Sequence, residues 1–176
     1  MALKKKKATK KSAKKSLVLE TNKGNIVIEL LNDLAPKHCD RILQLSKDKF
    51  YDDVVFHRVI EGFMAQTGDG QYGSLKNGVH DDRVGMGGSD LPNLKAEFTS
   101  EPFVRGIVGM ARSQDPNSAN SQFFIMLEDS PHLNNQYTVW GKVVKGMDVV
   151  DKIKKGDHLD NGKVDTPDFI KTIKNV

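Results

Sequence analysis

Alternating hydrophobic residues predict that this chain folds mainly as short β-strands. The first such segment carries, around a turn at 22–25, the residues Leu17, Leu19, Ile26, Ile28 and Leu30. A period of two puts these side chains on one face of a strand, so the segment is predicted to be a β-hairpin. Similar hydrophobic runs predict further strands at 55–60, 63–66, 106–111, 122–126, 138–144 and 169–173.

Two segments instead have hydrophobic residues at every third or fourth position, the spacing of an amphipathic helix. The first begins at Pro36, a residue suited to a first helical turn, and is expected to end near 47–49. The second is predicted over Gly146–Lys155, with Gly156 as its C-terminal cap. Many short strands with only two helices favour an antiparallel β-barrel over a fold of alternating strands and helices.

The stretch FHRVIEGFMAQTGD, residues 56–69, places one cation among hydrophobic residue types. Strand alternation predicts that Arg58 shares a face with Phe56. By the same alternation His57 points the opposite way, as a structural histidine packed behind Arg58. Arg58 is therefore expected beside hydrophobic neighbours.

Further residues could complete a pocket around Arg58. Phe63, Met64 and Gln66 follow a predicted turn, and Phe124 lies in a later predicted strand. Together they would form a small hydrophobic pocket with one cationic donor and one amide. The three hydrophobic residues are equally compatible with an ordinary core, and only their link to Arg58 favours the pocket.

Composition places the chain among single-domain globular proteins. It has 176 residues, and 38% of them are hydrophobic, which is enough for a sizeable core. Cys39 is the only cysteine, so no internal disulfide can form and a cytoplasmic location is expected. No hydrophobic run approaches the roughly 20 residues of a membrane helix, and no secretory signal is predicted.

Residues 1–16 are predicted to be a disordered, Lys-rich tail, and residues 17–176 a single domain. The tail holds eight Lys and no acidic residue, so the formal charge of +4 for the whole chain becomes −4 for the domain. Two interpretations of the tail stay open. Lys4–Lys15 could contact a polyanion such as nucleic acid, or the segment could act only as a solvated, solubilising extension.

Two motifs closely resemble the signatures of the cyclophilin family of peptidyl-prolyl cis-trans isomerases. They are FHRVIEGFMAQTGD at 56–69 and MARSQDPNSANSQFFI at 110–125, and the resemblance extends over about 17–176. It implies a mainly β fold, a closed eight-stranded antiparallel β-barrel capped by two α-helices, with the active site on the outer surface of the barrel. It also implies an enzyme that accelerates rotation about X-Pro peptide bonds in polypeptides and assists protein folding.

The resemblance also assigns roles to individual residues. Arg58 is the implied catalytic side chain, because a guanidinium directed at the proline nitrogen would stabilise the lone pair that appears as the amide twists. The implied substrate-binding residues are Phe63, Met64, Gln66, Ala111, Arg112, Gln122, Phe124, His132, Leu133 and Tyr137. No cofactor is expected, and no metal site is predicted because the five histidines show no ligand spacing.

Three positions depart from the residues that are usual in the family. His132 stands where many members carry Trp, Tyr137 where His is common, and Arg112 where Asn is frequent. The catalytic arginine and the hydrophobic pocket are retained, so activity is expected. The family's Trp assists tight cyclosporin binding, so weak binding is predicted in its place. The loop at 70–82 is also longer than in compact members of the family.

Two functional classes remain open at this point. The first is an isomerase that acts on proline-containing polypeptides, expected to be a monomer. The second is a non-catalytic module that holds a proline-bearing partner in the same groove and is localised by the basic tail. Retention of Arg58 favours the enzyme, since binding alone does not require it.

Overall fold

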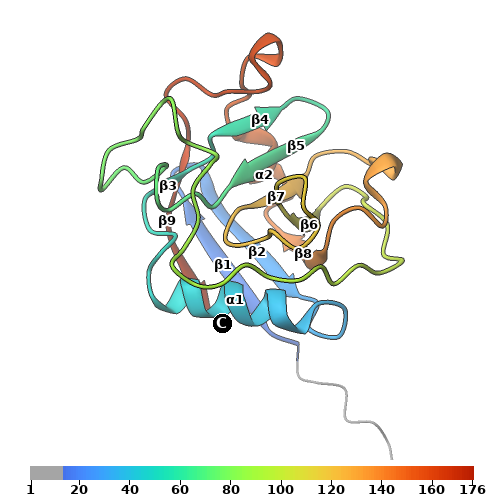
Figure 1. The fold of residues 1–176 in the computed structure, drawn as a ribbon. Coiled ribbons are helices and arrows are strands. Elements are labelled where there is room, and N and C mark those ends of the chain that lie inside the picture. Colours follow the sequence, from blue (N-terminus) through green and yellow to red (C-terminus); the bar gives the residue numbers. More distant parts are fainter. Residues whose placement is uncertain (1–13) are drawn as a thin grey trace, which may run out of the picture.

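The structure, a computed structural model, describes residues 14–176 and consists mainly of β-strands (Figure 1). Its elements are β1 (Ser16–Thr21), β2 (Gly24–Leu30), α1 (Pro36–Lys47), β3 (Val54–Val55), β4 (Arg58–Ile60), β5 (Met64–Thr67), β6 (Ile107–Met110), β7 (Phe123–Met126), the 3-10 helix η1 (Pro131–Leu133), β8 (Val139–Lys145), α2 (Met147–Lys152), the 3-10 helix η2 (His158–Asp160) and β9 (Phe169–Asn175). β1 begins at Ser16, one residue inside the predicted tail. The disorder and polyanion contact predicted for that tail fall mostly on residues 1–13, outside the described ones, and stay predictions.

The nine strands form one curled sheet in the order β3-β9-β1-β2-β8-β6-β7-β5-β4, and neighbouring strands are antiparallel. A mainly β fold with two helices is thus confirmed. The expectation of a closed barrel of eight strands is wrong in both count and closure. β3 and β4 are the edges of the sheet, and no backbone ladder joins them within the described residues.

The two edge strands are consecutive in the chain, separated only by Phe56 and His57. The predicted strand at 55–60 is broken there: the Phe56 N–H donates to the Asp168 carbonyl at 2.8 Å, in register with the pairing of β3 and β9, whereas Arg58 pairs with Gln66 of β5. Because this short link joins the two edge strands, the curled sheet has its two edges next to each other. Phe56 turns into the main core, where it is fully buried, so the prediction that it shares a face with Arg58 is wrong.

Helix α1 follows the prediction and packs against β8 and β9 (Figure 1). Its N-cap position is Ala35, whose side chain offers no hydrogen-bond acceptor. The carboxylate of Glu97 takes that role, since it accepts from the backbone N–H groups of Lys37 and His38 at 3.3 and 2.9 Å. A residue about sixty positions away in the chain thus satisfies the free amides at the start of the helix.

Helix α2 packs against β2 and is shorter than predicted. It ends at Lys152, because Ile153 adopts an extended backbone conformation. The Lys154 N–H then donates to the Asp168 carboxylate at 2.8 Å, so Gly156 is not the cap of this helix. None of the helices in the described part of the chain has the length and hydrophobicity needed to cross a bilayer.

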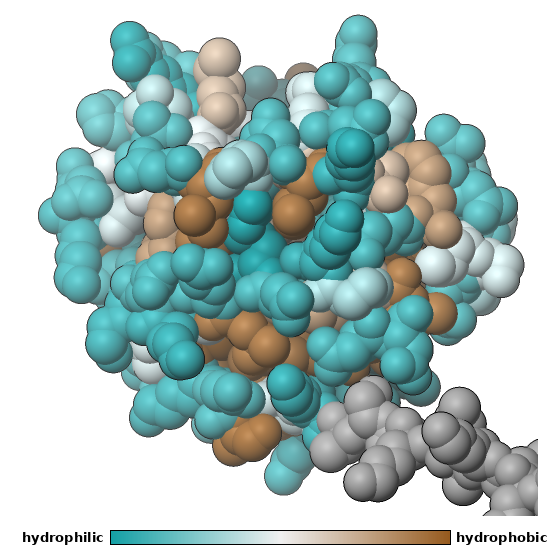
Figure 2. Space-filling model, turned by 60° about the horizontal axis from the view of Figure 1, so that its bottom comes forward, coloured by the Kyte–Doolittle hydropathy of each residue, from teal (hydrophilic) through white to brown (hydrophobic). Residues whose placement is uncertain are grey.

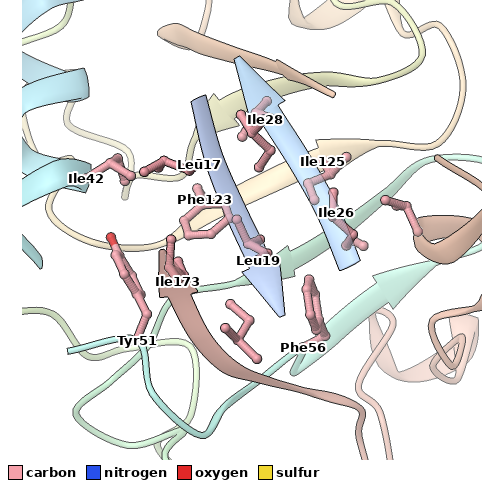
Figure 3. Packing of buried hydrophobic residues seen from close by; sticks show 14 of the residues in the cluster. Leu17, Leu19, Ile26, Ile28, Ile42, Tyr51, Phe56, Phe123, Ile125 and Ile173 are labelled. Carbon is pink, nitrogen blue, oxygen red and sulfur yellow. The ribbon is translucent and has the colours of Figure 1, made fainter. Parts of the chain in front are cut away.

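The main hydrophobic core lies inside the curl of the sheet (Figure 3). The alternating residues of the first hairpin point into it as predicted, and Ile42 and Cys39 of α1 close one side of it. Its largest fully buried side chains are aromatic. They are Trp140, Tyr51, Phe56 and Phe123, with the ring centroids of Phe123 and Trp140 5.4 Å apart.

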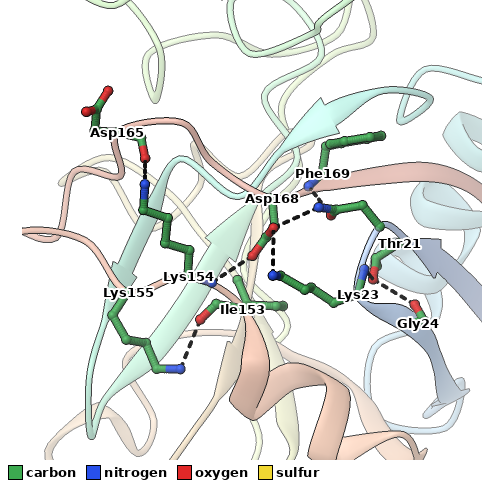
Figure 4. A network of polar contacts seen from close by, with 10 residues as sticks. Thr21, Lys23, Gly24, Ile153, Lys154, Lys155, Asp165, Asp168 and Phe169 are labelled. Atoms are coloured by element: carbon green, nitrogen blue, oxygen red, sulfur yellow. Dashed lines mark hydrogen bonds and ion pairs between the residues drawn. The ribbon is translucent and has the colours of Figure 1, made fainter.

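The two ends of the segment between α2 and β9 lie close together, since Lys154 at its start is hydrogen-bonded to Asp168 at its end. Asp168, at its end, is buried and accepts from the Lys154 backbone N–H and from the Asn22 side-chain amide, each at 2.8 Å (Figure 4). The Lys23 ammonium lies 3.8 Å from the same carboxylate. This network closes the base of the segment, so that the part carrying η2 projects beside β4 (Figure 1).

The surface seen in Figure 2 is largely polar, with hydrophobic groups in several separate patches. The most exposed large hydrophobic side chains in the described residues are Leu159 and Met86, at 86% and 78% exposure. Scattered hydrophobic groups of this kind are normal on a soluble protein surface.

Candidate active site

A cavity of about 550 Å³ opens beside β4, β5 and β7. It lies on the face of these strands opposite the main core, because Ala65, Phe123 and Ile125 belong to that core and their neighbours point the other way. The sequence-predicted residues that line it are Arg58, Phe63, Met64, Gln66, Ala111, Arg112, Phe124, Leu133 and Tyr137. The structure thus brings together side chains from a span of eighty residues.

The strand residues Arg58, Met64, Gln66 and Phe124 form what we call the floor of the cavity. Arg58 in β4 is directly opposite Gln66 in β5, and Gln66 is directly opposite Phe124 in β7. Side chains that face each other in adjacent strands stand on the same side of the sheet about 5 Å apart. The sheet register therefore places a cation, an amide and an aromatic ring in one row.

A glycine behind Phe124 makes room for this ring. Gly109 in β6 is the ladder partner of Phe124. A Cβ atom at position 109 would lie 2.7 Å from Phe124 Cζ and 2.7 Å from Phe103 Cε1. Without that Cβ the two rings stack at a centroid distance of 5.9 Å, so the floor is packed from below.

The Arg58 guanidinium is half-buried and held at three nitrogen positions. Nη1 donates to Gln66 Oε1 at 3.1 Å, Nε donates to the Asn161 carbonyl at 3.0 Å, and Nη2 donates to Asn161 Oδ1 at 3.0 Å. Burial lowers the pKa of Arg58, and the nearby Tyr137 opposes that shift. Arginine nevertheless stays protonated at physiological pH.

Gln66 is itself held by a chain of hydrogen bonds that ends in the long loop at 70–89. Its Nε2 donates to Gln122 Oε1 at 3.0 Å, and Gln122 Nε2 donates to the carbonyls of Gly85 and Gly87, each at 2.9 Å. The fully buried Asp69 fixes these two glycines, since its Oδ2 accepts from their N–H groups at 2.8 and 3.0 Å. The amide of Gln66 is thereby oriented with its oxygen toward Arg58.

The other sequence-predicted lining residues lie outside the β-strands and form what we call the rim: Phe63, Ala111, Arg112, Leu133 and Tyr137. Arg112 stacks on the Tyr137 ring with its Cζ 4.6 Å from the ring centroid, and its Nε and Nη2 donate to the Gln136 carbonyl at 3.1 and 2.5 Å. The Tyr137 ring in turn meets Phe124 edge-on at 5.6 Å. Two of the three residues that depart from the family pattern thus contact each other.

Two predicted substrate-binding residues do not line this cavity. Gln122 lines an adjoining cavity of about 390 Å³ and contacts the lining of the main one through Gln66 and Gly85. His132 is exposed and lines neither of the two cavities, and its ring lies 5.8 Å from that of Phe63. The structure therefore gives His132 a position behind the rim.

The prediction that His57 faces away from Arg58 is wrong. His57 is 7% exposed and lines the same cavity, because the break between β3 and β4 interrupts the alternation on which the prediction rested. Both of its ring nitrogens are buried without a hydrogen-bond partner among the described residues. Burial lowers its pKa to about 4, with a further decrease from Arg58 and an opposing effect of Asp69.

Sequence reasoning missed Asn161, which lines the cavity and accepts two hydrogen bonds from Arg58. Within the described residues no three His, Cys, Asp or Glu side chains are grouped so that they could hold a metal ion. The Asn-Gly pair at 161–162 signals a turn, but nothing in the sequence places that turn next to β4.

Comparison with known sequences points to one family. Residues 16–175 match the family described as cyclophilin type peptidyl-prolyl cis-trans isomerase/CLD. A Brucella suis protein named probable peptidyl-prolyl cis-trans isomerase is 59% identical over 155 residues, which cover 88% of this chain and 79% of that protein. Human peptidyl-prolyl cis-trans isomerase-like 3 is 38% identical over 144 residues, which cover 80% of this chain and 82% of that protein.

Comparison with solved structures agrees. A crystal structure of a cyclophilin type peptidyl-prolyl cis-trans isomerase from Cryptosporidium parvum matches with a TM-score of 0.79 and 28% identity, covering 93% of this chain and 98% of that one. A structure of a protein of that description in the presence of the dipeptide Ala-Pro matches with a TM-score of 0.76 and 30% identity, covering 90% and 96%. The resemblance carried by the two sequence motifs is confirmed, and this chain belongs to the cyclophilin-type peptidyl-prolyl cis-trans isomerases.

Proposed function

We propose that the cavity binds an X-Pro segment of a polypeptide and that Arg58 stabilises the twisted imide during isomerisation. The proline ring would pack between the floor residues Met64 and Phe124 and the rim residues Phe63 and Leu133. These four side chains are hydrophobic members of the cavity lining, which also contains Arg58. The dipeptide Ala-Pro present with the related Cryptosporidium parvum protein supports a ligand of this size.

One observation carries the proposal: the half-buried Arg58 is held by neutral groups. Its hydrogen-bond acceptors are the side-chain amides of Gln66 and Asn161 and the Asn161 carbonyl. Among the ion pairs of residues 14–176, Arg58 is not a member. A partly buried cation without a counter-charge is costly to the protein, because it has lost hydration that no ion pair replaces. Since no ion-pair partner in the described part of the chain neutralises the charge of Arg58, its positive field remains available to a substrate.

The reaction needs such a field and little else. Amide resonance opposes rotation about the X-Pro bond with a barrier of roughly 18–20 kcal/mol, so the uncatalysed reaction takes tens to hundreds of seconds. In the twisted state the nitrogen lone pair is localised and accepts a hydrogen bond that the planar amide cannot accept. A guanidinium N–H donor aimed at this nitrogen therefore binds the transition state more strongly than either ground state, which is the condition for catalysis.

The other cavity residues would hold one side of the rotating bond still. Gln66 and the backbone at Ala111 and Arg112 lie along the cavity beside the hydrophobic pocket. A polypeptide bound in extended form against them would keep its position while the carbonyl on the other side of the bond turns. No covalent intermediate and no proton transfer is required.

The test is an X-Pro peptide isomerisation assay on the wild type, Arg58→Ala and Arg58→Lys. We expect Arg58→Ala to lower kcat/KM by about 10²- to 10³-fold, the usual loss when one preorganised donor is removed. Arg58→Lys should recover part of the rate, because it restores the charge without the planar fork of donors. Arg83→Ala is the matched control, since Arg83 is exposed and lies outside the cavity lining.

Urea unfolding of each variant separates loss of catalysis from loss of fold. Wild-type rates for a folded Arg58→Ala protein would contradict the proposed role of Arg58. If instead the wild type and Arg58→Ala both bound proline peptides and neither accelerated isomerisation, the cavity would act as a binding module, the second class that the sequence left open.

A further inference from the structure

Asn161 contacts Arg58 through both of its oxygen atoms. Its main-chain carbonyl accepts from Nε and its side-chain Oδ1 accepts from Nη2, each at 3.0 Å. With Gln66 on Nη1, three of the five N–H donors of the guanidinium are occupied. One N–H on each terminal nitrogen is left for a substrate. Asn161 and Gln66 therefore fix the orientation of the guanidinium plane, because they accept hydrogen bonds from all three of its nitrogen atoms.

The backbone around Asn161 is shaped for this contact. Asn161 follows η2 in the left-handed conformation, with φ 54° and ψ 32°. This region is unfavourable for most residues, and Asn is one of the few side chains that enter it readily. At this position one residue can direct its carbonyl and its side-chain amide to the same neighbour.

The loop that carries Asn161 is bound to β4 by main-chain hydrogen bonds. The Val59 N–H donates to the Gly162 carbonyl at 2.9 Å, and the Val59 carbonyl accepts from Gly156 at 2.8 Å. The Val164 N–H donates to the His57 carbonyl at 3.1 Å. These bonds lie on both sides of Arg58 in the chain, so the register between Asn161 and Arg58 is set by the backbone. The Asp168 network closes the base of the same segment (Figure 4).

We infer that Asn161 is a positioning residue for the isomerase reaction, which fixes the Arg58 guanidinium in the orientation that meets the imide nitrogen. The inference rests on the role proposed above for Arg58. An arginine side chain loses rotamer freedom when it is fixed, and a site that has already fixed it does not incur that cost again during the reaction. Asn161 is also uncharged, so it orients the cation without neutralising it.

Asn161→Gly tests the side chain with little disturbance of the backbone. Glycine adopts the left-handed conformation freely and keeps the main-chain carbonyl, so only the Oδ1 acceptor is lost. We expect kcat to fall about tenfold with KM nearly unchanged, because misorientation of a catalytic group affects the transition state more than substrate binding. Asn161→Asp keeps the acceptor but adds a counter-charge, and it should also lower kcat at neutral pH.

Lys49→Gly is the matched control. Lys49 is exposed, has φ 59° and lies just after α1, outside the cavity lining. Lys49→Gly therefore measures the effect of placing glycine at a left-handed position far from the cavity, and this variant should leave kcat unchanged.

The decisive measurement is a double-mutant cycle with Arg58→Ala. If Asn161 acts through Arg58, Asn161→Gly lowers kcat in the wild-type background and has no further effect in the Arg58→Ala background. An unchanged kcat for Asn161→Gly, or the same fold loss in both backgrounds, would overturn the positioning role. Full activity of Arg58→Ala by itself would instead overturn the proposed function, so the two failures are distinguishable.

Discussion

The floor and the rim of the cavity are built in different ways. Arg58, Gln66 and Phe124 of the floor stand on adjacent strands in direct register, and buried groups such as Gly109 and His57 pack beside or beneath them. The rim residues Leu133 and Tyr137 come from η1 and the loop that follows it, whose turns are held by short-range hydrogen bonds.

This difference assigns different tasks to the two regions. A charge that must meet a developing lone pair has to be held to a fraction of an ångström, and side chains on a sheet are held more precisely than those on loops. A surface that admits varied polypeptides only has to offer hydrophobic area and adjust its shape. We therefore expect floor substitutions to change kcat or stability, and rim substitutions to change KM.

Phe124→Ala should have the largest effect, because Phe124 is 5% exposed, stacks on the buried Phe103 and contacts the rim residue Tyr137. We expect the free energy of unfolding to fall by about 3–5 kcal/mol, as for other buried phenylalanines, together with most of the activity. Urea unfolding and the isomerisation assay measure the two losses. Phe124→Leu keeps much of the buried volume and should be milder. A fully stable Phe124→Ala protein would show that the floor is not a packed unit.

His57→Leu tests whether the buried, uncharged His57 beside the floor makes the stability of the protein depend on pH. In the folded protein the pKa of His57 is lowered to about 4, below the ordinary value of 6.5, so the unfolded chain binds more protons between these pH values. The free energy of unfolding should therefore fall as the pH drops from 6.5 through 4, by up to about 3 kcal/mol from this residue. The His57→Leu protein should lack that part of the decrease.

The measurement is urea unfolding of both proteins at several pH values between 7 and 4.5. Burial also lowers the pKa of His38, but that residue is common to both proteins and cancels in their difference. Parallel stability curves for wild type and His57→Leu would contradict the assignment of this pH dependence to His57.

Leu133→Ala should act mainly on binding. Leu133 is 9% exposed and lines the rim, so its truncation removes hydrophobic contact with the proline ring. The loss of two to three buried carbon groups, at about 0.8 kcal/mol each, predicts a KM increase of about 15- to 60-fold with kcat nearly constant. Leu75→Ala, at an exposed loop leucine outside the cavity lining, is the control. A selective fall in kcat would remove the distinction between floor and rim.

Arg112→Gln should have the smallest effect. The stacking of Arg112 on Tyr137 lies at the edge of the cavity, and such a contact contributes about 0.5–1 kcal/mol at an exposed site. We expect a change in KM of about two- to fivefold at most. Thermal unfolding and the peptide assay should both show it. A large loss of kcat would instead place Arg112 in the catalytic machinery beside Arg58.

The sequence determined the local parts of this protein. Period-two alternation predicted the first hairpin and the strands that carry Arg58, Gln66 and Phe124, and helical spacing predicted α1. These features are visible in a sequence because burial on one face of an element imposes a pattern on neighbouring residues. The two long motifs then linked Arg58 with the lining residues that they contain: Phe63, Met64, Gln66, Ala111, Arg112 and Phe124.

Only the tertiary structure decided how these parts meet. Asp168, near the end of the chain, contacts both the break at Phe56 and His57 and the segment after the shortened α2: its carbonyl accepts from Phe56 and its carboxylate accepts from Lys154. The contact between Asn161 and Arg58 joins residues 103 positions apart. Hydrogen bonds across such separations form because burial leaves polar groups that must find partners, and which partners are near is a property of the folded chain, not of any local pattern.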